Sequence, residues 1–109
     1  QPVKDCRSYT APLVYGYLVV DTGPDAGKKY SLSSVSVSIG RHEDCDIVLS
    51  DNSVSRRHAR LELHRGRYTV SDEGSTNGTW VNGVKITSKV LEPGDTVTLG
   101  TTSCTFKVE

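Results

Sequence analysis

Apolar and polar residues alternate along most of this chain, which is the pattern of strands with one face in a core and the other in solvent. No window of about eleven residues carries the apolar spacing of an amphipathic helix. A longer apolar run at 13–20, LVYGYLVV, indicates a more deeply buried strand. The alternating apolar positions elsewhere are Val35, Val37 and Ile39, Leu61 and Leu63, Tyr68 and Val70, Val97 and Leu99, and Cys104, Phe106 and Val108. The chain is therefore predicted to be all-β.

Turn signals separate these runs at short intervals. GPDAG at 23–27 combines the preset φ of proline with two permissive glycines, and EPGD at 92–95 turns the chain into its penultimate strand. Tight hairpins are predicted at 64–67, HRGR, and at 82–83, Asn-Gly. A very short strand is expected at 47–49 between two loops. Many short strands with such turns favour a β-sandwich over a small closed barrel.

The charge of the chain is balanced, with 13 Lys and Arg residues against 13 Asp and Glu residues. Proteins that coat nucleic acids or lie on membrane surfaces need a broad basic field, so neither partner is expected. No run approaches the roughly 18 consecutive apolar residues of a membrane span, so this fragment is not expected to cross a membrane. An anion-binding site in such a chain has to be built locally, by the geometry of a few residues.

The length of 109 residues is that of one domain. Residues 1–12 show no periodicity and contain two prolines, which predicts a flexible tail or linker, and residues 13–109 form the predicted domain. The first residues, QPVKDC, include neither an initiator methionine nor the core of a signal peptide. We therefore expect a monomeric domain of a longer protein, in the cytoplasm or on the cytosolic side of a membrane-anchored parent.

Three cysteines, Cys6, Cys45 and Cys104, are odd in number and lack the spacing of a metal site. We interpret them as free thiols in a reducing compartment, with a disulfide that involves Cys6 as the alternative. The histidine, cysteine and aspartate residues between positions 42 and 58 also fit no closed metal site. Neither a metal nor another cofactor is expected.

Two segments carry most of the hydrogen-bond donors that could serve a ligand. DNSVSRRHARL at 51–61 and DEGSTNGTWVNG at 72–83 are rich in hydroxyls, amides, glycines and arginine, and strand-like runs flank both. They fall in two long loops, 40–58 and 71–79, and loops at one end of a sandwich lie close together. Convergent N–H, hydroxyl and guanidinium donors favour recognition of a phosphate.

Four motifs in register resemble those of the forkhead-associated (FHA) domain family. They are Gly40-Arg41, the box Ser55-Arg56-Arg57-His58, Asn77-Gly78 and a second pair at Asn82-Gly83. The match covers about residues 13–108. The resemblance implies a twisted β-sandwich of about eleven short, mainly antiparallel strands. It also implies binding of phosphothreonine peptides of partner proteins in Ser/Thr-kinase signalling, the class of recognition known for this family.

Carried over position by position, the resemblance implies five residues in contact with the ligand. Arg41 would pair with the phosphate, Ser55 would donate its hydroxyl to a phosphate oxygen, and Arg56 would add a variable contact. Thr76 would also reach the phosphate. Asn77 would hydrogen-bond the peptide main chain beside the phosphothreonine.

Other motif residues are implied to hold the loops in place. His58 would brace the serine-bearing loop by hydrogen bonding, and Asn82 would tie loops together. Trp80 is interpreted as a packing residue. The glycines expected to meet a backbone requirement, either a positive φ or a close approach, are Gly40, Gly78 and Gly83.

Three alternatives stay open. A phospho-independent interaction domain would use a sandwich face, although the complete set of Arg41, Ser55 and Asn77 disfavours it. Ser55 as a nucleophile with His58 as base would need an orienting acid and a strand-to-helix turn, and neither is evident, so an enzyme is not expected. A phosphorylated Thr10 in the tail would dock into the site of its own chain or of a neighbouring copy, whereas an inert linker is the simpler interpretation.

Overall fold

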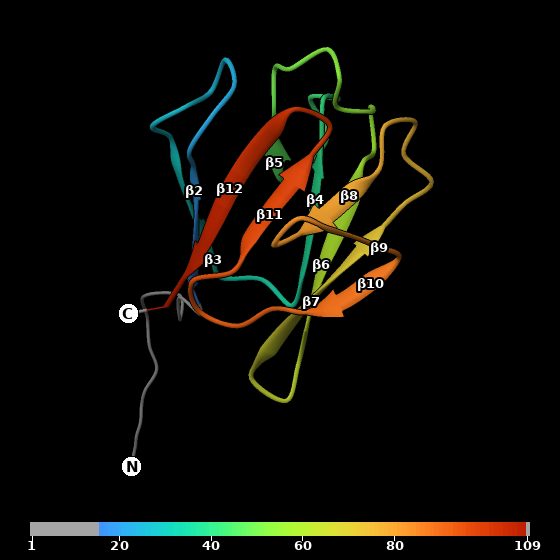
Figure 1. Ribbon diagram of the computed structural model, residues 1–109. Helices are drawn as coiled ribbons and strands as arrows, with labels where there is room; N and C mark the ends of the chain where they lie inside the picture. The colour runs from blue at the N-terminus through green and yellow to red at the C-terminus, as the bar shows by residue number, and fades with distance from the viewer. Residues whose placement is uncertain (1–15, 109) are drawn as a thin grey trace.

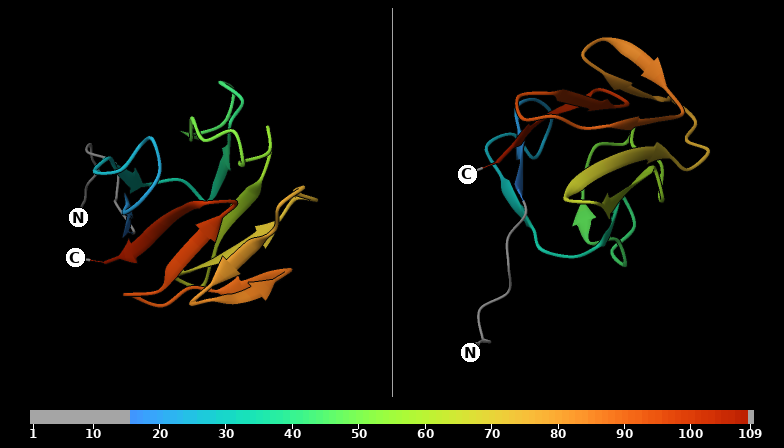
Figure 2. Two further views of the ribbon diagram at one scale, coloured as in Figure 1. Left: turned by 45° about the horizontal axis from the view of Figure 1, so that its top comes forward. Right: turned by 90° about the horizontal axis from the view of Figure 1, so that it is seen from below.

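The computed structural model describes residues 16–108, which form two β-sheets that enclose one core (Figures 1 and 2). The six-stranded sheet has the order β3-β2-β12-β11-β8-β9, and the five-stranded sheet has the order β10-β7-β6-β4-β5. The strands are β2 (Gly16–Val20), β3 (Lys29–Leu32), β4 (Ser36–Gly40), β5 (Ile47–Val48), β6 (Ala59–His64), β7 (Arg67–Asp72), β8 (Thr79–Val81), β9 (Val84–Ile86), β10 (Ser88–Val90), β11 (Thr96–Leu99) and β12 (Thr102–Lys107).

Within the described residues all strand pairs are antiparallel except the short parallel pair of β4 and β5. The predicted all-β sandwich of about eleven strands is confirmed. No helix long and apolar enough to cross a membrane occurs in this part of the chain. The predicted tail at 1–12, the first residues of the predicted strand at 13–20, Cys6 and Thr10 lie outside the described residues.

The core consists of the inward-facing residues of both sheets. Leu61 and Val70 from the five-stranded sheet, and Leu18 and Val97 from the six-stranded sheet, are almost completely buried. The ring of Tyr68 meets that of Phe106 across the sandwich edge-on, with centroids 6.2 Å apart. Period-two alternation thus produces the layered core that the sequence predicts.

Two apolar residues expected on inward faces are exposed instead. Val35 precedes β4 and is 67% exposed, and Val108 follows β12 and is 48% exposed. Alternation continues past both strand ends in the sequence, but the opposing sheet no longer covers these positions. The prediction that Val35 shares the buried face of Val37 and Ile39 was wrong for that reason.

Two hairpins close as the turn residues predict. Arg65 and Gly66 have φ of 53° and 78° between β6 and β7, and Asn82 and Gly83 have φ of 52° and 84° between β8 and β9. Two successive positive φ values match the right-handed twist of the flanking strands. Strand β10, in contrast, was not predicted, because all three of its residues are exposed and show no alternation.

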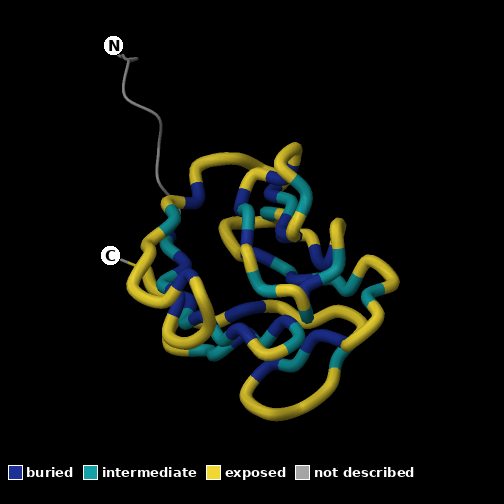
Figure 3. Tube along the Cα trace, turned by 90° about the horizontal axis from the view of Figure 1, so that it is seen from above, coloured by how far each residue is buried: buried dark blue, intermediate teal, exposed yellow. Residues whose placement is uncertain are grey.

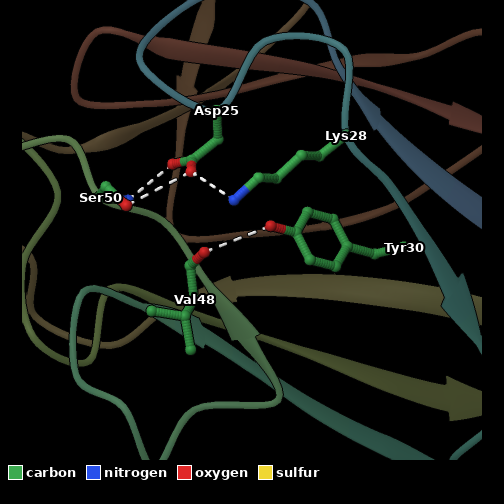
Figure 4. A network of polar contacts seen from close by, with 5 residues as sticks. All are labelled: Asp25, Lys28, Tyr30, Val48 and Ser50. Atoms are coloured by element: carbon green, nitrogen blue, oxygen red, sulfur yellow. Dashed lines mark hydrogen bonds and ion pairs between the residues drawn. The ribbon is translucent and has the colours of Figure 1, made fainter.

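Hydrogen bonds at one end of the sandwich join the β2–β3 loop to the chain around β5 (Figure 4). Asp25 is buried and accepts from the Ser50 N–H at 2.6 Å, and Lys28 Nζ lies 3.1 Å from its carboxylate. The Tyr30 hydroxyl donates to the Val48 carbonyl at 3.3 Å. The Ser50 N–H, together with Lys28, holds the pKa of Asp25 below its ordinary value, although burial opposes this. The network links the two sheets at the end where the long loops lie.

Candidate functional site

The long connecting loops gather at the end of the sandwich drawn at the top of Figure 1. Segment 41–46 follows β4, segment 49–58 follows β5, and segment 73–78 joins β7 to β8. Figure 3 looks onto this end, where exposed loop positions lie over a buried interior. The two segments that the sequence analysis singled out therefore lie at one end, as the sandwich model requires.

Gly40 permits the close contact on which the first loop depends. A Cβ atom at Gly40 would lie 2.0 Å from the carbonyl oxygen of Arg56, an impossible distance, so only glycine fits. The backbone N–H groups of Arg41 and His42 donate to the carbonyls of Ser55 and Arg56 at 3.0 and 3.1 Å. The end of β4 is thereby locked against the serine-bearing loop.

The Arg41 side chain is fixed at its Nε atom, while its terminal NH₂ groups are open to a ligand. Its Nε–H donates to the Val54 carbonyl at 3.1 Å. Its two terminal NH₂ groups form no hydrogen bond or ion pair with the rest of the described chain. The side chain lines an open depression with His42, Glu43 and Arg56. A guanidinium fixed through Nε and free at its outer face can form a two-pronged contact with an oxyanion.

Ser55 and His58 connect the loops to each other. The Ser55 N–H donates to Nδ1 of His58 at 3.0 Å, and Nε2 of His58 lies 2.8 Å from the Gly78 carbonyl. Because Nδ1 accepts a hydrogen bond, the ring proton is on Nε2 and is donated to Gly78. The His58 side chain is 0% exposed. His58 therefore spans both loops as a neutral, buried bridge.

The hydroxyl of Ser55 adds a second connection between the loops. Its Oγ accepts the N–H of Thr76 at 3.0 Å, which leaves the hydroxyl proton available to a ligand. The Asn77 amide donates to the Ser53 carbonyl at 2.7 Å. Thr76 and Asn77 are both exposed at the loop surface. The structure thus brings Arg41, Ser55, Thr76 and Asn77 together.

Arg56 borders the same depression and has an exposed side chain. Its carbonyl accepts hydrogen bonds from the His42 N–H and, at 3.3 Å, from the Cys45 thiol.

Asn82 lies elsewhere, at the far end of β8. Its amide donates to Asp95 at 3.0 Å, and its oxygen accepts the Thr96 N–H at 3.0 Å. Asn82 therefore ties the β8–β9 turn to the start of β11, while other residues brace the 49–58 and 73–78 loops.

Asp72 is one organising residue that the sequence analysis did not single out. Its carboxylate accepts from the hydroxyls of Ser75 and Thr79 and from the N–H groups of Gly74 and Ser75, and so it shapes the whole 73–79 loop. Burial acts to raise the pKa of Asp72, but the Ser75 and Thr79 bonds prevail and hold it below its ordinary value. An aspartate directly before Glu-Gly-Ser is a turn signal that points to this role.

Asp51 plays the corresponding part in the 49–58 loop. Its carboxylate accepts from the hydroxyls of Thr101 and Thr102 at 2.5 and 2.8 Å and from the N–H of Ser53 at 2.9 Å. These bonds, led by that of Thr101, hold the pKa of Asp51 well below its ordinary value of 3.8. Nothing near Asp51 in the sequence signals the contacts with Thr101 and Thr102, because these two residues lie 50 and 51 positions further along the chain.

We expect Asp51→Asn to lower the free energy of unfolding by about 1.5–3 kcal/mol at neutral pH, the usual contribution of a hydrogen bond to a charged group. Folding depresses the pKa of Asp51. The stabilisation is therefore present above pH 3.8, the ordinary pKa of the group, and is lost as the pH falls below that value. The difference from wild type should therefore shrink on acidification, as measured by urea unfolding across pH. Glu62→Gln, at an exposed position of β6, serves as the control. A difference that does not change with pH would contradict this role.

Cys45 and Cys104 are buried free thiols, in line with the free-thiol interpretation for these two residues. Burial raises the pKa of Cys104 to about 12. No group of three or more His, Cys, Asp or Glu side chains within residues 16–108 is placed to hold a metal ion.

Comparison with known proteins identifies the family of the chain. Residues 20–109 match the family model of the cytoplasmic domain of an inner-membrane component of type III secretion systems. The glycogen accumulation regulator GarA of Mycolicibacterium smegmatis is 49% identical over 83 residues, which are 76% of this chain and 52% of GarA. The oxoglutarate dehydrogenase inhibitor of Corynebacterium diphtheriae is 45% identical over a stretch that covers 84% of this chain and 64% of the inhibitor. The chain spans between about half and two thirds of the length of these relatives.

Solved structures show the same fold. An FHA domain studied for its phosphothreonine-dependent interactions superposes with a TM-score of 0.80 at 33% identity, over 86% of this chain and 96% of its own. EmbR of Mycobacterium tuberculosis, in complex with a low-affinity phosphopeptide, superposes with a TM-score of 0.78 at 32% identity. The superposition covers 86% of this chain and 24% of EmbR. The chain belongs to the family of the matched model and, by fold and by motif, is a forkhead-associated domain.

Proposed function

We propose that this domain recognises partner proteins by binding a phosphothreonine peptide between the 41–46, 49–58 and 73–78 loops. The observation that carries the proposal is the pairing of Arg41 with Ser55. Backbone hydrogen bonds fix the two residues side by side, yet the terminal NH₂ groups of Arg41 and the Ser55 hydroxyl proton have no acceptor among the described residues. Donors fixed in this way suit an anion with several acceptor oxygens.

Each residue then has a distinct task. Arg41 forms the charge-assisted contact with the phosphate, and Arg56 adds positive charge at the rim of the same depression. Ser55 and Thr76 donate hydroxyl hydrogen bonds to phosphate oxygens. Asn77, whose amide also holds the loop to Ser53, contacts the peptide main chain.

The energies are consistent with a reversible signalling contact. Phosphothreonine carries a charge of about −1.5 to −2 and three acceptor oxygens. Hydrogen bonds to charged groups contribute about 1.5–3 kcal/mol each. Three or four of them, less the cost of ordering the peptide, leave roughly −8 kcal/mol, which is micromolar binding. An unphosphorylated peptide lacks these bonds and should hardly bind.

The relatives support a regulatory role for the parent protein. A regulator and an enzyme inhibitor are among them, and one structural neighbour is bound to a phosphopeptide. We propose that the domain is a monomeric binding module rather than an enzyme and acts in Ser/Thr-kinase signalling. A cytoplasmic location is supported by the description of the matched family model. No nucleic acid or cofactor is part of this proposal.

Calorimetric titration with three peptides of one sequence, carrying phosphothreonine, phosphoserine or threonine, tests the proposal. We expect micromolar binding of the phosphothreonine peptide and none of the threonine peptide. The peptide sequence should come from a partner captured from extract, with phosphatase treatment of the captured partner as a second arm. Equal binding before and after phosphatase treatment would refute the proposal and favour a phospho-independent contact through a sandwich face.

A further inference from the structure

The strongest unexplained feature near the site is an aromatic residue paired with a cation at its edge. Trp80 on β8 and Lys85 on β9 are direct cross-strand partners. Trp80 alternates with the buried Thr79 and Val81, so its ring lies on the outer face of the six-stranded sheet. Lys85 Nζ lies 6.0 Å from the centroid of this ring. The pair forms a flat apolar surface with a positive charge beside it.

This pair, the Trp80–Lys85 platform, adjoins the proposed peptide site. A Cβ atom at Gly78 would lie 3.1 Å from Lys85 Cε and 3.1 Å from Cη2 of the Trp80 ring. Gly78 directly follows Asn77, the residue proposed to hold the peptide main chain, so the platform lies beside the proposed peptide site. The positive φ of 90° at Gly78 turns the chain from the loop into β8 at this point.

The charge of the platform selects what it can bind. Lys85 is exposed and forms no ion pair with any residue of the described chain. Thr98, the partner of Trp80 on β11, is uncharged, so no carboxylate faces the platform along this row. A carboxylate from a ligand would therefore meet an unpaired ammonium group, whereas a lysine or arginine would be repelled by it.

We propose that the Trp80–Lys85 platform is a specificity subsite that favours an aspartate or glutamate in the bound phosphopeptide, on the side that continues past Asn77. The inference rests on the proposed function of the neighbouring loops. The aliphatic part of the acidic side chain lies on the Trp80 ring, and its carboxylate pairs with Lys85. The preference is moderate, because an ion pair at the rim of an interface is partly screened by solvent.

The test is a set of phosphothreonine peptides with aspartate, alanine or lysine placed at each flanking position in turn, titrated against the wild-type domain. We expect one side of the phosphothreonine to show about threefold tighter binding for aspartate than for alanine. The preference should fade in 0.5 M salt, where the screening length falls to about 4 Å. Lys85→Glu should invert the order, so that lysine is preferred to aspartate at the same position.

Lys89→Glu is the matched control, since Lys89 is also an exposed lysine on a short strand but lies on β10 in the other sheet. It should keep the wild-type preference. An aspartate preference that Lys85→Glu does not change, or no preference at any position, overturns the subsite. If wild type and Lys89→Glu bind phosphothreonine peptides in that case, the proposed function stands alone. If neither protein binds any phosphorylated peptide, both proposals fail.

Discussion

Replacing Arg41 with alanine is expected to weaken binding of the phosphothreonine peptide by about a hundredfold or more while the domain stays folded. In the proposed complex the guanidinium forms two hydrogen bonds to the phosphate dianion, each worth about 1.5–3 kcal/mol, and alanine provides no replacement for them. Folding depends little on this exposed side chain, because its one described hydrogen bond is the part-buried bond from Nε to the Val54 carbonyl. Isothermal titration and a thermal unfolding curve measure the two effects separately.

Two further variants sharpen this experiment. Arg57→Ala removes a neighbouring exposed arginine whose side chain forms no hydrogen bond or ion pair within residues 16–108, and this variant should bind like wild type. Arg41→Lys keeps the charge but loses the planar fork, so it should restore only part of the affinity. Wild-type affinity in Arg41→Ala would remove Arg41 from the site, and equal losses in Arg41→Ala and Arg57→Ala would indicate a nonspecific charge effect.

Replacing His58 with alanine is expected to reduce both stability and affinity. The imidazole is fully buried and bridges the Ser55 N–H and the Gly78 carbonyl at 3.0 and 2.8 Å. Its removal leaves two polar groups unpaired, at about 1–3 kcal/mol each, and opens a cavity beneath the loops. A total of about 3 kcal/mol would lower the melting temperature by roughly 12–24 °C in a domain of this size.

Affinity should fall as well, by about tenfold, because the loop that carries Ser55 loses its connection to the loop that carries Thr76 and Asn77. Circular dichroism melting, with titration at a temperature where the variant is fully folded, separates the two losses. His64→Ala is the control, since His64 is exposed at the end of β6. An unchanged melting temperature in His58→Ala would argue against the bridge.

Local pattern alone was sufficient for much of the fold. Alternating residues in β6, β7 and β11 identify their inward faces, since a period of two admits one orientation per strand. Arg65-Gly66 and Asn82-Gly83 specify their turns because few residues tolerate positive φ. Pattern failed at Val35 and in β10, where exposure depends on where the opposing sheet ends and on which strand lies at an edge.

Some site residues could likewise be identified from the sequence, and others only from the structure. The motifs identify Arg41, Ser55 and Asn77 as ligand contacts by resemblance, and the structure places them together, although a contact with phosphate stays a prediction. Asp51 and Asp72, which shape the two loops, belong to none of these motifs, and of the two only Asp72 carries a local turn signal. The importance of Asp51 comes from Thr101 and Thr102, which meet it only after folding.

The amino-acid sequence alone determined the fold class, the hairpins and the set of donors available to an anion, because each follows from side chains a few residues apart. Only the tertiary structure decided why Gly40 must be glycine, where Asn82 acts, and that Lys85 lies beside Gly78 without an ion-pair partner in the described chain. Each of these depends on contacts between different segments of the chain, because the position where one strand ends determines which residues of a neighbouring segment it can contact.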